Sequence, residues 1–283
     1  MTEYRTFGNL STMKIHRFPF LYIFFFFLLT LAFLDNFRRA SEEKLDSFVG
    51  FKNSKLPYLV IQTDASKPIK SKENYRKCDV TFISDYSEIE NYFEKNEKPQ
   101  KFRAKIRGRG NSTWVSFDTN KRSYLLKFDE EISLYGLPGS RKWILQANLT
   151  DKTSLRNVYA YHLGQEIFTN VGWTPKTKFV NLSINNKNIG LYGVMEKAEI
   201  SPNRINLPLD ENDESFLAEV NSRLNRAWNF KSDKSVNFSI REKEGANQEY
   251  YLQAEEKLKN FEEILYGEDF KNPNFGYRAY IDF

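Results

Sequence analysis

Apolar and charged residues alternate most regularly at the start of the stretch from Lys101 to Lys127. The even positions hold Phe102, Ala104, Ile106 and Gly108, and the odd positions from 101 to 109 hold only Lys and Arg. Because successive side chains of a strand point to opposite faces, this pattern predicts a strand with one core face and one cationic face. Gly-Arg-Gly-Asn-Ser-Thr at 108–113 breaks the period, and an apolar run returns at 124–128. We interpret the stretch as a hairpin.

Other short apolar or alternating runs predict further strands. They lie at 58–63, 79–83, 142–146, 179–184 and 189–195, with two shorter candidates at 215–220 and 236–241. Between the fourth and fifth of these runs stands Asn185-Asn186-Lys187-Asn188, whose residues tolerate a positive φ. This segment therefore predicts a second hairpin turn.

Two segments have helical periodicity. The first runs from about Lys152 to Phe168 after a cap at Thr150-Asp151, and its apolar positions on one side are Leu155, Val158, Tyr159, His162, Leu163 and Ile167. The second runs from Gln248 to Tyr266 and stops at Gly267; its apolar positions are Tyr251, Ala254, Leu258, Phe261 and Leu265. Together the elements indicate an α+β fold with a mostly antiparallel sheet.

The N-terminal part of the chain contains an uncharged segment of 17 residues, 18–34. Its length is near the lower limit for a membrane-spanning helix, and it also fits the apolar core of a secretory signal. We read it as a transmembrane anchor, with a cleaved signal as the alternative and Met13 as an alternative start. Residues 1–17 are then a cytoplasmic N-terminus and 35–55 a linker, so the main domain is expected outside the cytoplasm.

Charge is distributed unevenly along the chain. The totals are 42 basic and 37 acidic residues, a net charge of +5. Residues 101–127 alone hold eight Lys or Arg against one acid, Asp118, which predicts an anionic, phosphate-bearing ligand. Nucleic acid is disfavoured, because aromatic residues are not interleaved with the basic ones. A single cysteine and two histidines disfavour a zinc site and exclude an intrachain disulfide.

Five motifs occur in an informative order. They are RGRGNSTW at 107–114, YLLKF at 124–128, KWILQAN at 142–148, DKTSLRN at 151–157 and GLYGVME at 190–196. In these motifs the chain, from about Leu56 to its end, resembles the CotH family, which is named after a spore coat protein. Members of that family are atypical protein kinases with a divergent kinase-like fold. The resemblance implies ATP and Mg²⁺ as cofactors and phosphoryl transfer to Ser or Thr of an exported or surface protein.

The resemblance also implies a set of nucleotide-binding residues. Gly108 and Gly110 would let backbone N–H groups approach the phosphates, while Arg107 and Arg109 would bind phosphate oxygens. An ordinary hairpin turn with solvated arginines is the alternative for these four residues. Lys127 matches the strand lysine that holds nucleotide phosphates in kinases, and a solvent-facing lysine is its alternative.

Three more positions complete the candidate site. The strand lysine needs a carboxylate partner, and Glu166 and Glu196 are the two candidates, between which spacing does not decide. Arg156, at the helix opening, is either structural or a phosphate ligand. Residues 195–199 leave their strand where a kinase hinge would bind adenine.

No catalytic residue and no metal ligand can be assigned in this sequence. In the family these acids come from a lobe that follows the second helix, whereas this chain ends at Phe283. We therefore expect a nucleotide-binding lobe at 56–200 and the start of a second, truncated lobe at 201–283. The sequence leaves two functions open: an incomplete CotH-like kinase, or an inactive membrane-anchored surface protein that binds an acidic partner through its basic hairpin.

Overall fold

A computed structural model describes one compact unit within Ser54–Phe283. The described residues are 56–83, 100–111, 114, 121–167, 173–207, 214–223, 226, 228–241, 243 and 245–280. The anchor expected at 18–34 lies outside these ranges. Among the helices of the described residues, none is long and apolar enough to cross a membrane.

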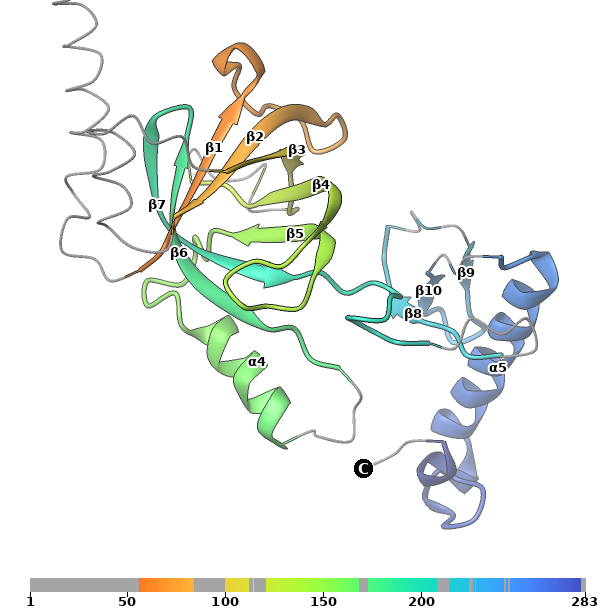
Figure 1. Cartoon of the computed structure of the whole chain (residues 1–283). Coiled ribbons are helices and arrows are strands. Elements are labelled where there is room, and N and C mark those ends of the chain that lie inside the picture. Colours follow the sequence, from red (N-terminus) through yellow and green to blue (C-terminus); the bar gives the residue numbers. More distant parts are fainter. Residues whose placement is uncertain are drawn as a thin grey trace, which may run out of the picture. The chain divides into compact units, whose positions relative to one another are not determined.

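Seven strands form a closed barrel (Figure 1). The strands are β1 (Tyr58–Thr63), β2 (Arg76–Ile83), β3 (Lys101–Gly108), β4 (Tyr124–Ile132), β5 (Ser140–Gln146), β6 (Thr177–Ile184) and β7 (Lys187–Glu196). Around the barrel they follow the order β1-β2-β3-β4-β5-β7-β6. Strand β1 pairs with β6 in parallel and closes the barrel, while the other neighbouring strands are antiparallel.

The α+β class and the mostly antiparallel sheet are confirmed, whereas closure of the sheet was not predicted. Alternation along a strand fixes which face is buried, but it does not specify the partner of an edge strand. Here β1 pairs with β6, which lies far away in the chain, from Tyr58 opposite Asn181 to Ile61 opposite Ile184. The β6–β7 turn is as predicted, with Asn185 and Asn186 at φ of 53° and 62°.

The predicted core face of β3 is also confirmed. Ala104 and Ile106 are buried within the barrel. They join the large buried side chains Leu126, Phe128, Trp143 and Tyr192, which β4, β5 and β7 contribute. The cationic side chains of β3 therefore lie on the outer face of the barrel, as the alternation requires.

Helix α4 (Arg156–Ile167) begins later than predicted, and its predicted apolar face is wrong. A turn with Ser154 at φ 58° precedes it, and the Asp151 carboxylate accepts a 2.9 Å hydrogen bond from the backbone N–H of Arg156. Leu155, Tyr159 and Ile167 are exposed by 54–63%. The buried residue is Gly164, where an added Cβ would lie 2.8 Å from Thr174. The helix also packs Tyr161 against the buried cluster of Leu125, Ile144 and Met195, and neither Gly164 nor Tyr161 belongs to the predicted apolar face.

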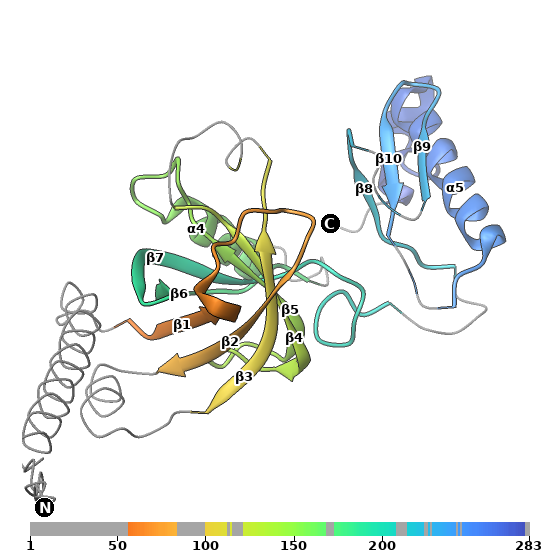
Figure 2. The same cartoon turned by 90° about the horizontal axis from the view of Figure 1, so that it is seen from above.

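The C-terminal part contains a small sheet and a long helix, which lie side by side in Figure 1 and Figure 2. Strands β8 (Ala218–Val220), β9 (Trp228–Lys231) and β10 (Asn237–Ile240) pair in the order β8-β10-β9. Helix α5 (Gln248–Tyr266) has the predicted bounds, and Trp228 stacks on its Tyr251 with ring centroids 5.7 Å apart. Strand β9 was not predicted. Three 3-10 helices, Asp64–Ser66, Glu268–Lys271 and Tyr277–Ala279, complete the described structure.

Candidate functional site

The strand register arranges the outer face of the barrel in rows. In one row Arg107 lies opposite Leu125, and Leu125 lies opposite Ile144 on β5. Ile144 in turn lies opposite Met195 on β7. In the neighbouring row Lys105, Lys127 and Lys142 lie opposite one another on β3, β4 and β5. Like charges that face each other across strands are unfavourable, so the row of three lysines favours an anionic partner.

A cleft of about 440 Å³, which we call the basic cleft, opens beside the first row. Its lining combines β3, the segment after β7 and residues around the C-terminal sheet: Lys72, Glu73, Arg107, Arg109, Gly110, Asn111, Leu125, Ile144, Lys197, Ala198, Arg223, Arg226 and Arg241. An adjoining hollow of about 330 Å³ shares five of these residues and adds Lys142 and Glu199. Cationic side chains therefore surround a small apolar wall, Leu125 and Ile144.

Arg107 and Arg109 enter the cleft from the end of β3. The Arg109 guanidinium donates to Gln146 Oε1 at 3.3 Å, and Arg107 donates to the backbone oxygen of Lys72. Among the described residues, no carboxylate lies within ion-pair distance of either arginine. Burial lowers the pKa of Arg109, and the neighbouring charge of Arg107 lowers it further. A desolvated guanidinium without a carboxylate is costly unless an anion binds to it.

Lys197 lies where the chain leaves β7. Its Nζ is 3.4 Å from Glu199 Oε2, which also lies 3.3 Å from Lys142 Nζ. Burial lowers the pKa of Lys197 to about 8, and Lys142 and Arg241 lower it while Glu199 opposes the shift. The Glu199 carboxylate thus pairs with both Lys142 and Lys197, and the net charge of the three groups is positive.

The C-terminal sheet contributes two further arginines to the cleft. Glu219 on β8 accepts from Arg226 Nε at 2.6 Å and from Arg241 Nη2 at 2.7 Å. Arg241 Nη1 also lies 3.5 Å from the backbone oxygen of Ala198. A single carboxylate therefore orients two guanidinium groups that line the same cleft.

The structure brings three of the predicted site residues together in the basic cleft: Arg107, Arg109 and Gly110. Gly110 has a φ of 111°, which favours glycine. Gly108 is buried, and a Cβ added there would lie 2.2 Å from the Trp114 ring, so this glycine makes room for an aromatic side chain. Lys127 is exposed one row away and is not among the residues that line the cleft.

The two predicted partners of Lys127 lie in different environments. Glu196 is 1% exposed and pairs with Arg204, which is also buried, at 2.9 Å. Its second oxygen accepts from the backbone N–H of Lys176. Glu166 is exposed on α4. Neither carboxylate forms an ion pair with Lys127 in the part of the chain that the structure describes.

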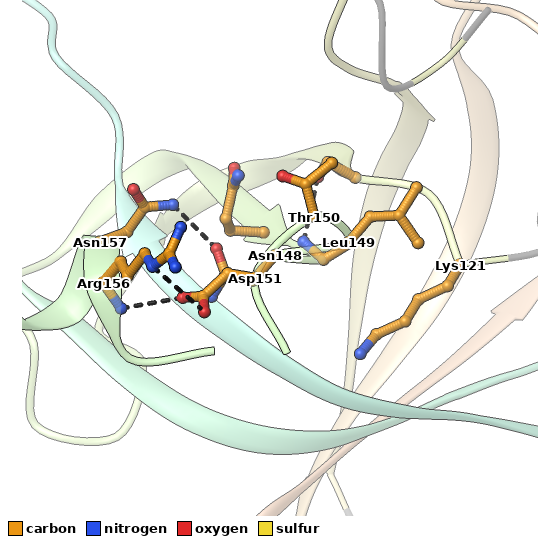
Figure 3. A pocket seen from close by; sticks show the side chains of 10 residues that line it. Lys121, Asn148, Leu149, Thr150, Asp151, Arg156 and Asn157 are labelled. Atoms are coloured by element: carbon orange, nitrogen blue, oxygen red, sulfur yellow. Dashed lines mark hydrogen bonds and ion pairs between the residues drawn. The ribbon is translucent and has the colours of Figure 1, made fainter. Parts of the chain in front are cut away.

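Arg156 lies in a different, smaller cavity of about 150 Å³ (Figure 3). Its side chain is 83% exposed and lies 3.9 Å from Asp151. Asn157 donates to Asn148, so this amide holds the turn before α4. Hydrogen bonds from Thr153 and from the backbone of Arg156 lower the pKa of Asp151. The lining of this cavity combines the Asp151 carboxylate with the cationic side chains of Lys121 and Arg156.

Sequence reasoning missed Lys197, Glu219, Arg226 and Arg241. The hinge expectation covered 195–199 but assigned its role to backbone groups. The two arginines stand beside strands β9 and β10, of which β9 was not expected at all. A search for isolated basic residues at the ends of short strands would have found Arg241.

Comparison with known families agrees with the motifs. The family model described as CotH kinase protein matches residues 106–283, from within β3 to the last residue. A search of curated proteins finds no match. The match covers more than half of the chain. The chain therefore belongs to the CotH kinase protein family.

Proposed function

We propose that the basic cleft binds the phosphates of ATP, and that the chain is the nucleotide-binding part of a CotH-like atypical protein kinase. One observation carries the proposal: Arg107 and Arg109 are partly buried in the cleft, and no described carboxylate pairs with them. Guanidinium groups bind phosphate oxygens bidentately, and a phosphate would offset their desolvation.

The apolar part of the cleft is small. Leu125 and Ile144 line it but are only 4% and 3% exposed, because they pack with Met195 and Tyr161, and the Ala198 carbonyl accepts from Lys197 Nζ at 3.3 Å. In this proposal the closed barrel corresponds to a divergent kinase small lobe. Residues from 201 onward correspond to the beginning of the second lobe. Phosphoryl transfer to Ser or Thr of an exported or surface protein is proposed from the family, and a membrane-anchored or exported location is proposed from the uncharged segment 18–34.

The family also implies Mg²⁺, and the described cleft does not fit it. Mg²⁺ prefers carboxylate and water oxygens. The lining of the basic cleft has one carboxylate, Glu73, among seven Lys and Arg side chains. Within the described ranges no cluster of three His, Cys, Asp or Glu side chains could hold a metal ion. We therefore derive no step of the reaction through a metal.

The test is a titration of the full chain with ATP, ADP, AMP and adenosine. We expect affinity to fall with each phosphate removed, because the arginines contribute most of the binding energy. Arg109→Gln should abolish the preference for ATP while leaving weak adenosine binding. Equal affinities across the series, or no binding at millimolar ATP, would contradict the proposal.

A second function, binding of an acidic partner by an inactive surface protein, is favoured by one observation. Lys101, Arg103, Lys105 and Lys127 are exposed on the outer face of the barrel, outside the basic cleft. An acidic polymer that binds to this face would lose affinity with Lys127→Ala, whereas a nucleotide held in the cleft would depend on Arg109.

A further inference from the structure

We propose that arginines on both sides of the basic cleft neutralise a polyphosphate directly, so that binding there does not require a divalent cation. The inference rests on the proposed function and specifies which form of the ligand the cleft accepts. It assigns Arg226 and Arg241, held by Glu219, to the side opposite the β3 arginines. The chemical class of the ligand is a linear polyphosphate, free or as part of a nucleotide.

The lining of the basic cleft is strongly cationic. Its cationic groups come from three places: Lys72, Arg107 and Arg109 near β3, Lys197 after β7, and Arg223, Arg226 and Arg241 around the C-terminal sheet. The lining carboxylate, Glu73, is exposed, and Glu199 in the adjoining hollow already pairs with Lys142 and Lys197. A free polyphosphate meets this field with its full negative charge, whereas a Mg²⁺ complex has lost two of those charges.

One carboxylate positions the two C-terminal arginines. Glu219 binds Arg226 through Nε and Arg241 through Nη2, which leaves other N–H groups of both guanidinium groups for a ligand. The Arg241 Nε atom is buried and has no hydrogen-bond partner among the described residues. Glu219 neutralises one of the two positive charges, and burial raises its pKa less than the two arginines lower it. The pair keeps a net positive charge in a fixed orientation.

A phosphate site that uses a metal ion has a different lining. In such a site carboxylates hold the cation, and the cation bridges phosphate oxygens. Here guanidinium groups from the end of β3 and from the C-terminal part line the same cleft, and they repel a divalent cation. A bound cation and a set of guanidinium groups are alternative ways to neutralise the same phosphates, and the described residues supply the guanidinium groups.

The experiment measures binding of inorganic tripolyphosphate and of ATP to the full chain, once in EDTA and once in excess Mg²⁺. We expect tripolyphosphate to bind in EDTA and to bind roughly tenfold more weakly in Mg²⁺, because the metal complex carries less negative charge. Arg226→Gln and Arg241→Gln should each lower the affinity in EDTA on the order of tenfold. Lys231→Gln, an exposed lysine of β9 outside the cleft, is the control and should change it less than about twofold.

Arg226→Lys keeps the charge without the planar group and should give an intermediate loss if Arg226→Gln does not fold. Binding that appears only with Mg²⁺, or unchanged affinity in both arginine variants, would overturn the inference. If tripolyphosphate binds in EDTA and ATP binds no tighter, the arginine arrangement holds and the nucleotide proposal fails. If neither ligand binds in either buffer, both proposals fail.

Discussion

The two ends of β3 present similar side chains in different surroundings. At the start, Arg103 is exposed, lies opposite Asp79 and shares a hollow with Asp64 and Asp129. At the end, Arg107 and Arg109 are partly buried and have no carboxylate partner among the described residues. Positive charges are evenly spaced along this stretch, but only those at the cleft end are both partly buried and without a carboxylate partner among the described residues.

This difference shows where a charged strand becomes a binding site. An exposed arginine beside aspartates is stable without a ligand, because water and nearby acids balance it. A partly buried arginine beside another arginine carries a cost that a bound anion removes. Burial and missing counter-charges, and not charge density alone, therefore distinguish the cleft end of β3.

A buried and paired arginine provides the strongest test of this distinction. Arg204 and Glu196 are both buried and 2.9 Å apart, and the Arg204 guanidinium lies 5.0 Å from the Trp143 ring centroid. Glu196→Gln should lower the free energy of unfolding by about 3–5 kcal/mol, because it leaves a buried charge unpaired. Denaturant unfolding measures this. Glu214→Gln, which removes the exposed partner of Lys257, is the control and should cost less than about 1 kcal/mol.

Gly108 separates the two cleft arginines and tests whether packing fixes their position. A Cβ at this position would meet the Trp114 ring at 2.2 Å. Gly108→Ala should therefore destabilise the protein by about 1–3 kcal/mol through overpacking. Gly193→Ala on β7 is the control, because a Cβ added there would lie 3.1 Å from Thr177 Oγ1 and the substitution should cost less. Gly136→Ala is unsuitable as a control, because the φ of Gly136 is 77°. Equal unfolding midpoints for Gly108→Ala and the wild type would show that the Trp114 contact is not rigid.

Lys197 extends the comparison to pH. Burial lowers the pKa of Lys197 from its ordinary value of 10.5 to about 8, so between these pH values the lysine is neutral in the folded protein and still charged in the unfolded chain. Nucleotide affinity should therefore fall several-fold between about pH 7 and pH 9, whereas the free energy of unfolding of the ligand-free protein should rise from about pH 8 towards 10.5. Lys197→Arg should flatten the affinity profile. A wild-type profile that is already flat would exclude Lys197 from phosphate binding.

Lys127 gives the smallest expected effect. It lies opposite Lys105 on one side and Lys142 on the other, and it is exposed. Lys127→Gln should raise the free energy of unfolding by a few tenths of a kcal/mol, since it relieves repulsion between facing like charges. The effect of Lys127→Gln on ATP affinity tests the sequence-based prediction that Lys127 holds the phosphates of the nucleotide. An affinity loss as large as that of Arg109→Gln would place Lys127 on the nucleotide.

The sequence predicted local features well and long-range ones poorly. Alternation in β3 and the Asn185-Asn186 turn are determined by neighbouring residues, and both are confirmed. Pairing of β1 with β6 depends on contacts between distant segments, which periodicity does not contain. The packed side of α4 contains Gly164, next to Thr174, and Tyr161, whereas the helical pattern pointed to the opposite residues Leu155, Tyr159 and Ile167, which are exposed.

The same limit applies to the site. Arg107, Arg109 and Gly110 are consecutive or nearly so, and one motif revealed all three. Arg226 and Arg241 come together because both donate to Glu219 on β8, a contact that depends on the folding of the C-terminal sheet. Glu196, one of the two carboxylates predicted as partners of Lys127, instead pairs with Arg204, a residue to which no sequence motif pointed.

The central claim is that the cleft end of β3, and not its exposed end, binds the phosphates of a nucleotide. The most direct test compares two double variants of the full chain with equal net charge, Arg107→Gln/Arg109→Gln and Arg103→Gln/Lys105→Gln, by titration with ATP. The account predicts that the first loses affinity on the order of a hundredfold, while the second stays within about threefold of the wild type. Equal losses in the two variants would contradict it, because binding would then follow the total charge of the strand and not the cleft.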